Sequence, residues 1–177
     1  MIKHGLILDI ELVAELEAKA GQAGAMMDSA LITKSVAIKA AVVSEDEKEA
    51  GRRTLLNYGH TVGHAIEAVT GYGEYLHGEA VAIGMRAAGM MSVELGLLRP
   101  EELERQQRMI RAYGLPETAP GVDVERIIAA TLQDKKVTAG AVQWVLLAGI
   151  GGAVVHGAID PEIVRRAVEA VVASGPG

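Results

Sequence analysis

The sequence predicts a mainly α-helical domain with a small β-hairpin near residues 142–157. Half of the 177 residues are apolar, yet aromatic residues make up only 3% and phenylalanine is absent. Alanine, leucine, valine, isoleucine and methionine must therefore fill the interior, and such residues favour helices that pack closely on one another. A chain of this length suits one domain, over residues 1–177, that buries a substantial core.

The first quarter of the chain predicts two helices. Asp9 can cap a helix that runs to about Ala20, because the apolar residues of this segment return on one stripe. A longer helix is expected over about residues 25–44, where nearly every position is apolar, so we expect it to be buried on most sides. Residues 1–8 are apolar but carry no helix-start signal, and they are interpreted as the end of a preceding element.

Two further helices are expected in the middle of the chain. One begins near His60, and the second runs from His77 to about Leu97 with an apolar residue at most positions. Gly78, Gly84 and Gly89 lie in the second segment, together with several alanines. Small side chains allow a neighbouring helix to approach closely, so this helix is predicted to be buried.

The last third predicts three helices and the hairpin. Pro100 suits the first position of an amphipathic helix, and Asp123 and Asp160 can each cap a later one. Between the last two helices, short apolar runs surround a group of glycines, as in a hairpin. The GIGGAV segment lacks the third glycine of a dinucleotide-binding fingerprint, and its flanks suggest strands. No nucleotide site is expected in this chain.

Composition excludes several classes of function. The net charge is 17 − 23 = −6, which argues against a nucleic-acid surface, because such a surface needs clustered lysine and arginine. The absence of cysteine excludes disulfides and thiolate metal ligands. The N-terminus has no signal-peptide pattern, and glycines and polar residues interrupt the most apolar stretch, Ala141–Ile159. We expect a cytoplasmic protein with neither membrane nor nucleic acid as its partner.

A cluster of three histidines is the strongest local signal. His60 and His64 are four residues apart, so on a helix both rings project from one face. His77 follows a glycine-rich turn and can fold back toward them. A single histidine often only caps a helix or satisfies a core, but three within eighteen residues, with glutamates nearby, favour a zinc site. Spacing alone nominates His60 and His64 as the ligand pair.

The segment LLNYGHTVGHAIEAVTGYGEYLHGEAVAIGM resembles the signature of the 3-dehydroquinate synthase family. KAAVVSEDEKEAGRR, the opening IKHGLILD and the later DKK follow the family's order, and the similarity runs from Met1 to about Val172. It covers the C-terminal half of a typical member. The family's N-terminal half, an α/β domain that binds NAD⁺, has no counterpart in this sequence.

The resemblance implies a lyase of the shikimate pathway, which leads to the aromatic amino acids. The substrate would be 3-deoxy-D-arabino-heptulosonate 7-phosphate, a phosphorylated sugar acid, and the products 3-dehydroquinate and phosphate. The cofactors would be Zn²⁺, or another divalent metal such as Co²⁺, and NAD⁺ bound mainly by the N-terminal half. That half is the expected partner, without which the chain would be inactive, and the full-length protein would form a homodimer.

The resemblance also implies roles for the histidines. His60 and His77 match the family's two zinc-binding histidines, and the third ligand, a glutamate, would fall immediately before residue 1. His64 matches a residue of proton transfer, which differs from the pairing that spacing suggests. Glu49 matches an acid–base residue, although within its charge run it also reads as a surface residue.

Further residues match positions that hold the substrate. Lys39 and Arg53 resemble the residues that bind its carboxylate, for which arginine offers a planar fork and lysine a point charge. Asn57 and one member of the Lys135-Lys136 pair resemble phosphate contacts, and Lys3 a residue near the sugar hydroxyls. The lysine pair also fits a solvated helix end.

Three alternatives remain open on the sequence. Another sugar-phosphate cyclase would share the metal-binding histidines, although the combination of Lys39, Arg53, Asn57 and His64 fits the dehydroquinate pattern better. A metal-dependent polyol dehydrogenase domain would share the histidines without needing cations for two anionic ends of its substrate. A non-catalytic helical module could bind a partner through the histidine face.

Overall fold

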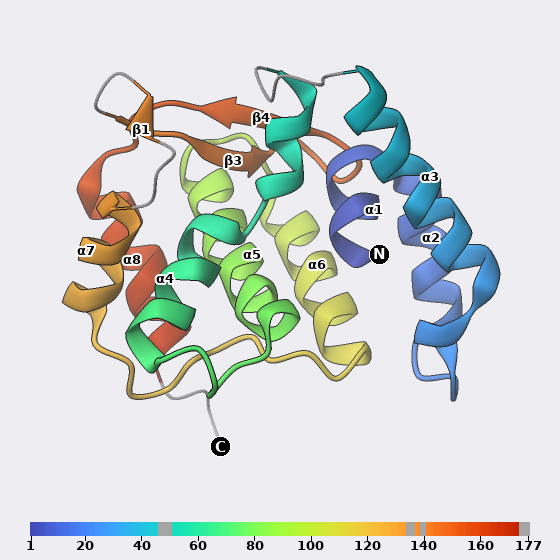
Figure 1. The fold of residues 1–177 in the computed structure, drawn as a ribbon, viewed down its shortest axis with the longest axis horizontal. Coiled ribbons are helices and arrows are strands. Elements are labelled where there is room, and N and C mark those ends of the chain that lie inside the picture. Colours follow the sequence, from blue (N-terminus) through green and yellow to red (C-terminus); the bar gives the residue numbers. More distant parts are fainter. Residues whose placement is uncertain (46–50, 134–136, 139–140, 174–177) are drawn as a thin grey trace.

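The computed structural model describes residues 1–45, 51–133, 137–138 and 141–173 (Figure 1). The helices are, in chain order, α1 (Ile2–Leu8), α2 (Ile10–Lys19), η1 (Ala25–Met27), α3 (Ser29–Glu45), η2 (Arg52–Asn57), α4 (His60–Thr70), α5 (His77–Glu94), α6 (Pro100–Ala112), α7 (Val124–Gln133) and α8 (Pro161–Val172). The strands are β1 (Val137–Thr138), β2 (Ala141–Val142), β3 (Trp144–Leu147) and β4 (Ala153–His156). The predicted fold class is confirmed.

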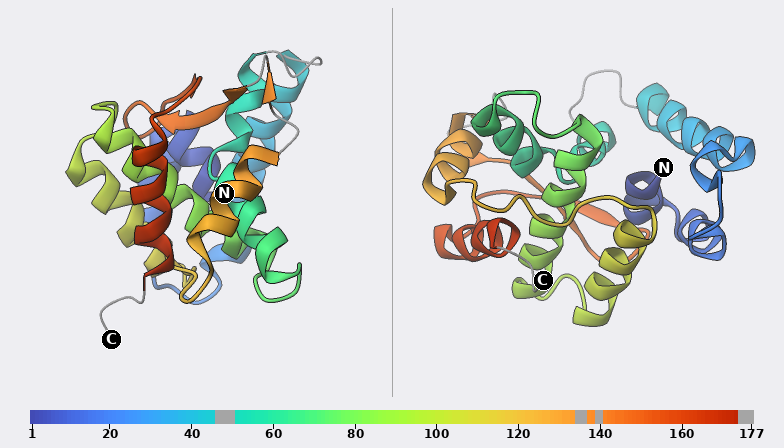
Figure 2. Two further views of the ribbon diagram at one scale, coloured as in Figure 1. Left: turned by 90° about the vertical axis from the view of Figure 1, so that its left-hand side faces the viewer. Right: turned by 90° about the horizontal axis from the view of Figure 1, so that it is seen from below.

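The helices form two groups, which meet where α1 contacts α6. α4, α5, α7 and α8 pack on one another, and α6 lies against α5. α1, α2 and α3 form the second group, at the right of Figure 1. The hairpin of β3 and β4 lies across one end of the helices, as all the views in Figures 1 and 2 show. Its strands are antiparallel and pair Trp144 with His156 and Leu147 with Ala153, which confirms the predicted hairpin.

Capping aspartates begin three of the helices, as predicted. The side chains of Asp9, Asp123 and Asp160 each accept a hydrogen bond of 2.9–3.0 Å from a backbone N–H two or three residues later. These bonds satisfy N–H groups that have no partner inside the helix. Local sequence therefore sets the starts of α2, α7 and α8.

Close packing of α5 against α4 and α6 depends on glycine. A Cβ atom on Gly84 would overlap the carbonyl oxygen of Gly59 and lie 2.8 Å from the backbone nitrogen of Gly63. A Cβ on Gly89 would lie 2.6 Å from a methyl carbon of Leu103 in α6. The predicted role of small residues is wrong for Gly78, because a Cβ there would meet no atom within 4 Å.

Helix α3 differs from the prediction that residues 25–44 are buried on most sides. Its buried residues are Leu31, Ser35 and Val42, whereas Ile32 and Val36 are 38% and 61% exposed. In the described part of the chain, α3 packs on α1, α2, η1 and η2 with one face, and its outer face is left to solvent. An almost continuous apolar sequence is therefore not enough to predict burial, because the neighbouring elements decide which faces of the helix are covered.

Residues 2–8 form a helix of their own, which the sequence did not predict. Met1 makes no side-chain capping bond at the start of α1, so the usual helix-start signal is absent. Burial of Ile2, Leu6 and Ile7 against the core stabilises this short helix instead. Within the described residues, no helix has both the length and the hydropathy that crossing a bilayer requires.

Candidate metal centre

Three histidine rings converge where α4 meets the start of α5. The ring centroid of His60 lies 5.3 Å from that of His64 and 5.4 Å from that of His77, and His64 and His77 are 5.8 Å apart. One nitrogen from each ring lies within 4.8 Å of the other two. The structure thus brings together the pair that spacing nominates and the pair that the family resemblance implies.

Local sequence explains why the rings meet. His60 and His64 share a face of α4 because they are one helical turn apart. Gly71 ends α4 in the left-handed conformation, with φ of 86°, which a side chain would oppose. Glu79 then accepts a hydrogen bond of 2.8 Å from the backbone nitrogen of Leu76 and fixes the start of α5. This turn brings His77, the first residue of α5, back beside the histidines of α4.

Hydrogen bonds orient two of the rings. Nδ1 of His60 lies 3.1 Å from the carbonyl oxygen of Tyr58, and Nδ1 of His77 lies 3.2 and 3.3 Å from the carboxylate oxygens of Glu67. A carbonyl and a carboxylate can only accept, so each Nδ1 is the donor. In a neutral ring Nε2 then carries the lone pair that can bind a metal.

A lysine ammonium already faces one of these lone pairs. Nζ of Lys3, on α1, donates to the carbonyl oxygen of Leu56 at 2.6 Å and lies 3.4 Å from Nε2 of His60. An ammonium group has only donors, which agrees with an unprotonated Nε2. Nε2 of His60 therefore presents its lone pair to a positively charged group.

This donor set fits a divalent transition metal. Zinc binds neutral imidazole nitrogen, and the second nitrogen of a zinc-bound histidine is normally hydrogen-bonded to a carbonyl or carboxylate. His60 and His77 have this arrangement, and His64 lies beside both. Side-chain exposure varies across the cluster, since His60 and His64 are half-buried and His77 is 59% exposed.

The predicted substrate-binding residues lie on elements that pack together. Lys3 is on α1, Lys39 on the exposed side of α3, Arg53 in η2 and Asn57 at its end, and α1, α3 and η2 contact one another. Glu49, Lys135 and Lys136 lie outside the described residues.

The electrostatics of His4 indicate that this region is positive. Burial, together with the positive charges of the Met1 amino group, Lys3 and Lys39, lowers the pKa of His4 to about 4. Nδ1 of His4 lies 2.8 Å from the hydroxyl of Ser35, which places the ring between α1 and α3. Positive charge thus surrounds the junction of these helices, next to the histidine cluster.

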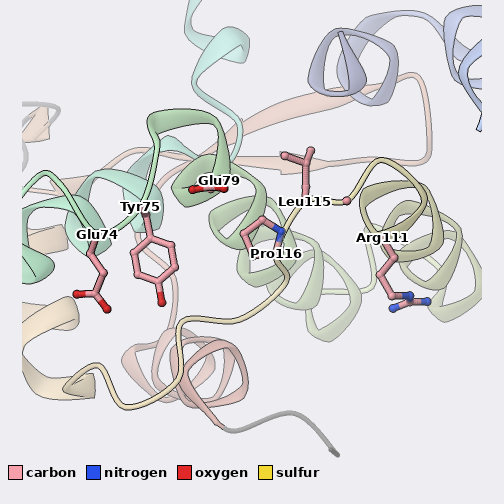
Figure 3. A pocket seen from close by; sticks show the side chains of 7 residues that line it. Glu74, Tyr75, Glu79, Arg111, Leu115 and Pro116 are labelled. Atoms are coloured by element: carbon pink, nitrogen blue, oxygen red, sulfur yellow. The ribbon is translucent and has the colours of Figure 1, made fainter. Parts of the chain in front are cut away.

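A separate hollow of about 550 Å³ lies beside the turn between α4 and α5 (Figure 3). It is lined by Glu74, Tyr75, Glu79, Arg111, Gly114, Leu115 and Pro116, none of which is a predicted site residue. Arg111 is paired with the carboxylate of Glu117 at 2.8 Å, so two carboxylates dominate the charge of the lining. The hollow is therefore unsuited to an anionic substrate.

Comparison with known proteins gives the family. Residues 1–137 match the family model described as 3-dehydroquinate synthase C-terminal. The chain belongs to the 3-dehydroquinate synthase family. The 3-dehydroquinate synthase of Nostoc punctiforme is 48% identical over 96% of this chain, and that of Acidithiobacillus ferrooxidans is 43% identical over 99%. The chain covers 48% and 49% of these relatives, so it spans about half of their length.

Two solved structures share the fold of this chain. 2-Epi-5-epi-valiolone synthase from Streptomyces hygroscopicus, with NAD⁺ and Zn²⁺ bound, matches with a TM-score of 0.83 at 26% identity, covering 96% of this chain and 48% of that one. A 2-deoxy-scyllo-inosose synthase complexed with carbaglucose-6-phosphate, NAD⁺ and Co²⁺ matches with the same TM-score at 22% identity. That match covers 97% of this chain and 50% of the other, and it shows the fold alone.

Two residues that contact the histidines of this family member had no predicted role. Tyr58 provides the carbonyl that orients His60, and Glu67 contacts His77. Glu67 lies three residues after His64, so the sequence places it near the histidine face of α4. No sequence signal marks the carbonyl of Tyr58, because every residue carries one.

Proposed function

We propose that this chain is the metal- and substrate-binding half of a 3-dehydroquinate synthase. The complete enzyme is a lyase that converts 3-deoxy-D-arabino-heptulosonate 7-phosphate into 3-dehydroquinate and phosphate in the cytoplasmic shikimate pathway. One observation carries the proposal: the rings of His60, His64 and His77 converge beside the elements that carry Lys3, Lys39 and Arg53. Identity of 48% to a synthase over most of this chain supports it.

In this proposal His60 and His77 would hold the metal, and the family resemblance implies a glutamate outside this chain as third ligand. Bound there, Zn²⁺ or Co²⁺ would supply Lewis-acid chemistry for the hydroxyl group that is oxidised. The backbone of Tyr58 and the carboxylate of Glu67 keep Nδ1 of these two rings engaged. NAD⁺ is bound mainly by the other half, which is the partner of this chain, and the complete enzyme forms a homodimer.

His64 is assigned to proton transfer. Its ring is 5.3 Å from that of His60 and 5.8 Å from that of His77, so it lies at the same site as the two proposed metal ligands. Histidine suits this role because its ordinary pKa lies near neutrality. Glu49, outside the described residues, is proposed as a second acid–base group.

The cationic side chains are assigned to the two anionic ends of the substrate. Lys39 and Arg53 bind the carboxylate, Asn57 and a lysine of the Lys135-Lys136 pair bind the phosphate, and Lys3 contacts the sugar hydroxyls. Fixing both ends restricts the motion of the substrate, so one site can align several successive steps. The positive environment of His4 supports an anion-binding role for this region.

Metal binding and turnover together test the proposal. Co²⁺ affinity of this chain is measured by competition with a chromophoric chelator for the wild type and for His60→Ala, His77→Ala and His64→Ala, with His156→Ala as control because it lies outside the histidine cluster. We expect the first two variants to bind Co²⁺ much more weakly, with residual affinity measurable at high Co²⁺ concentration, and the last two to keep the wild-type affinity. Equal loss in His64→Ala would make His64 a ligand and overturn its assigned role.

Turnover is measured as phosphate released from 3-deoxy-D-arabino-heptulosonate 7-phosphate with NAD⁺, after this chain is combined with the NAD-binding half of a relative. His64→Ala should retain metal and lose turnover. Release that proceeds unchanged in His60→Ala would refute the proposed site. A non-catalytic module predicts no release, and another cyclase predicts turnover only with a different sugar phosphate.

A further inference from the structure

We propose that Glu67 is a positioning residue that fixes the ring of His77 for metal binding. This inference rests on the proposed function, because it takes His77 as a metal ligand. It adds a role for a carboxylate that neither the sequence motifs nor the comparisons assign. Glu67 lies in the last turn of α4, and His77 begins α5.

The contact is directed at one atom. Both carboxylate oxygens of Glu67 face Nδ1 of His77, at 3.2 and 3.3 Å. Since the carboxylate accepts, Nδ1 carries the proton and Nε2 is left as the ligand atom. His77 is 59% exposed on the first turn of a helix, so its ring would otherwise sample several rotamers.

The low exposure of Glu67 distinguishes this contact from an ordinary surface ion pair. The side chain of Glu67 is only 12% exposed, and within the described ranges no lysine or arginine forms an ion pair with it. A buried carboxylate is costly unless it is hydrogen-bonded to a donor, and a charged donor compensates better than a neutral one. A metal ion on Nε2 would draw electron density from the ring and strengthen the hydrogen bond from Nδ1–H to the carboxylate of Glu67. Metal and carboxylate would therefore stabilise each other.

Glu67 lies on the same helix, α4, as His60 and His64. Glu67 follows His64 by three residues and His60 by seven, so all three lie along one face of the helix. One rigid helix thus carries two imidazoles and the anchor for the third. The rings of His60 and His77 are then held by acceptors from η2's end and from α4, respectively.

Co²⁺ binding to the full chain tests this role with a readout other than activity. Affinity from chelator competition and the visible absorption of bound Co²⁺ are recorded for the wild type, Glu67→Gln and Glu67→Ala. We expect Glu67→Ala to weaken binding by about 10–100-fold, the usual effect of losing a hydrogen-bond partner of a ligand. The Co²⁺ affinity of Glu67→Gln should lie between those of the wild type and Glu67→Ala, because its amide oxygen still accepts from Nδ1 but carries no charge. Glu74→Gln removes the same charge from the exposed turn nearby and should match the wild type.

A double-mutant cycle separates positioning from general effects of charge or folding. If Glu67 acts through His77, Glu67→Ala should change Co²⁺ affinity by no more than about twofold in a His77→Ala background. An equal loss in both backgrounds, or wild-type affinity and spectrum in both Glu67 variants, would overturn the inference. Unchanged affinity in His77→Ala alone would instead refute the proposed metal site. Melting curves without metal identify a variant that fails to fold, in which case Glu67→Gln carries the test.

Discussion

Gly84 of α5 lies so close to the carbonyl oxygen of Gly59 that no side chain fits between them. Gly59 immediately precedes α4, with φ of 78°, and a Cβ atom on it would lie 2.7 Å from the carbonyl oxygen of Val81. The contact is therefore backbone against backbone on both sides. Because α4 carries His60 and His64 and α5 begins with His77, this contact sets the distance between the histidines.

Replacing Gly84 with alanine should separate the two helices. We expect Gly84→Ala to lower the free energy of unfolding by about 2–3 kcal/mol, the upper range for overpacking a core, because backbone atoms cannot rotate away. Co²⁺ binding should weaken as well. Gly78→Ala is the control, since its Cβ meets nothing within 4 Å, and it should be neutral or slightly stabilising. Equal urea midpoints for both variants would contradict the structure.

Removing the hydroxyl of Tyr58 should reduce stability without abolishing metal binding. The fully buried hydroxyl donates to Oε1 of Gln106 at 2.7 Å, and Nε2 of Gln106 donates to the carbonyl oxygen of Met85 at 2.9 Å. Tyr58→Phe leaves a buried acceptor unsatisfied, which costs about 1–3 kcal/mol. Co²⁺ affinity should stay near the wild-type value, because the backbone carbonyl of residue 58 still orients His60. A variant as stable as the wild type in urea would disprove this role.

Stability should depend on pH through His4. Burial lowers its pKa from 6.5 to about 4 in the folded chain, so the unfolded chain binds more protons between these values. The free energy of unfolding should therefore be highest above pH 6.5 and fall as pH decreases toward 4, with no further loss from this group below that. The expected loss is about 1–2 kcal/mol, less than the full shift implies because the ring is partly exposed to solvent.

The variant His4→Asn isolates this contribution, since its amide can still reach Ser35 but does not titrate. Urea unfolding of both proteins across the same pH window should show a shallower slope for the variant. Carboxylates also titrate at the acidic end, so the difference between the two slopes is the quantity to compare. Identical slopes would mean that folding does not lower the pKa of His4 and would contradict this prediction.

Replacing Lys3 should strengthen metal binding by the isolated chain. Its ammonium lies 3.4 Å from Nε2 of His60, where it competes with a divalent ion and repels it. We expect Lys3→Met to raise Co²⁺ affinity by about 3–10-fold at low salt and by less as salt screens the repulsion. Lys34→Met is a charge-matched control, because Lys34 binds Glu15 at 2.9 Å on a different helix pair. Equal or weaker affinity in Lys3→Met would contradict this arrangement.

Local signals predicted the parts of the fold that depend on local bonds. Asp9, Asp123 and Asp160 cap the helices that the sequence assigned to them, and the glycines near residue 150 form the turn of the hairpin. Burial of α3 could not be predicted in this way. Its composition suits an interior, but whether Val36 is covered depends on which elements surround it, and segment composition does not contain that information.

The candidate site was predictable to a similar extent. Helical spacing brings His60 and His64 together, but the return of His77 depends on the turn after Gly71, and family resemblance was needed to pair it with His60. The hydrogen bond from His77 to Glu67 joins two elements, so it becomes visible only when that turn is built. The contact of Lys3 is still harder to predict, because Lys3 on α1 donates to the carbonyl oxygen of Leu56 in η2, which is 53 residues later in the sequence.

The outer face of α3 has a consequence for concentrated solutions of this chain. A net charge of −6 keeps molecules apart at low ionic strength, while Ile32 and Val36 offer apolar surface for mutual contact. Salt shortens the range of charge repulsion to about 10 Å at 0.1 M, which leaves the short-range attraction to dominate. Static light scattering should then record a second virial coefficient that falls from positive to negative as salt is added, and Val36→Glu should keep it positive.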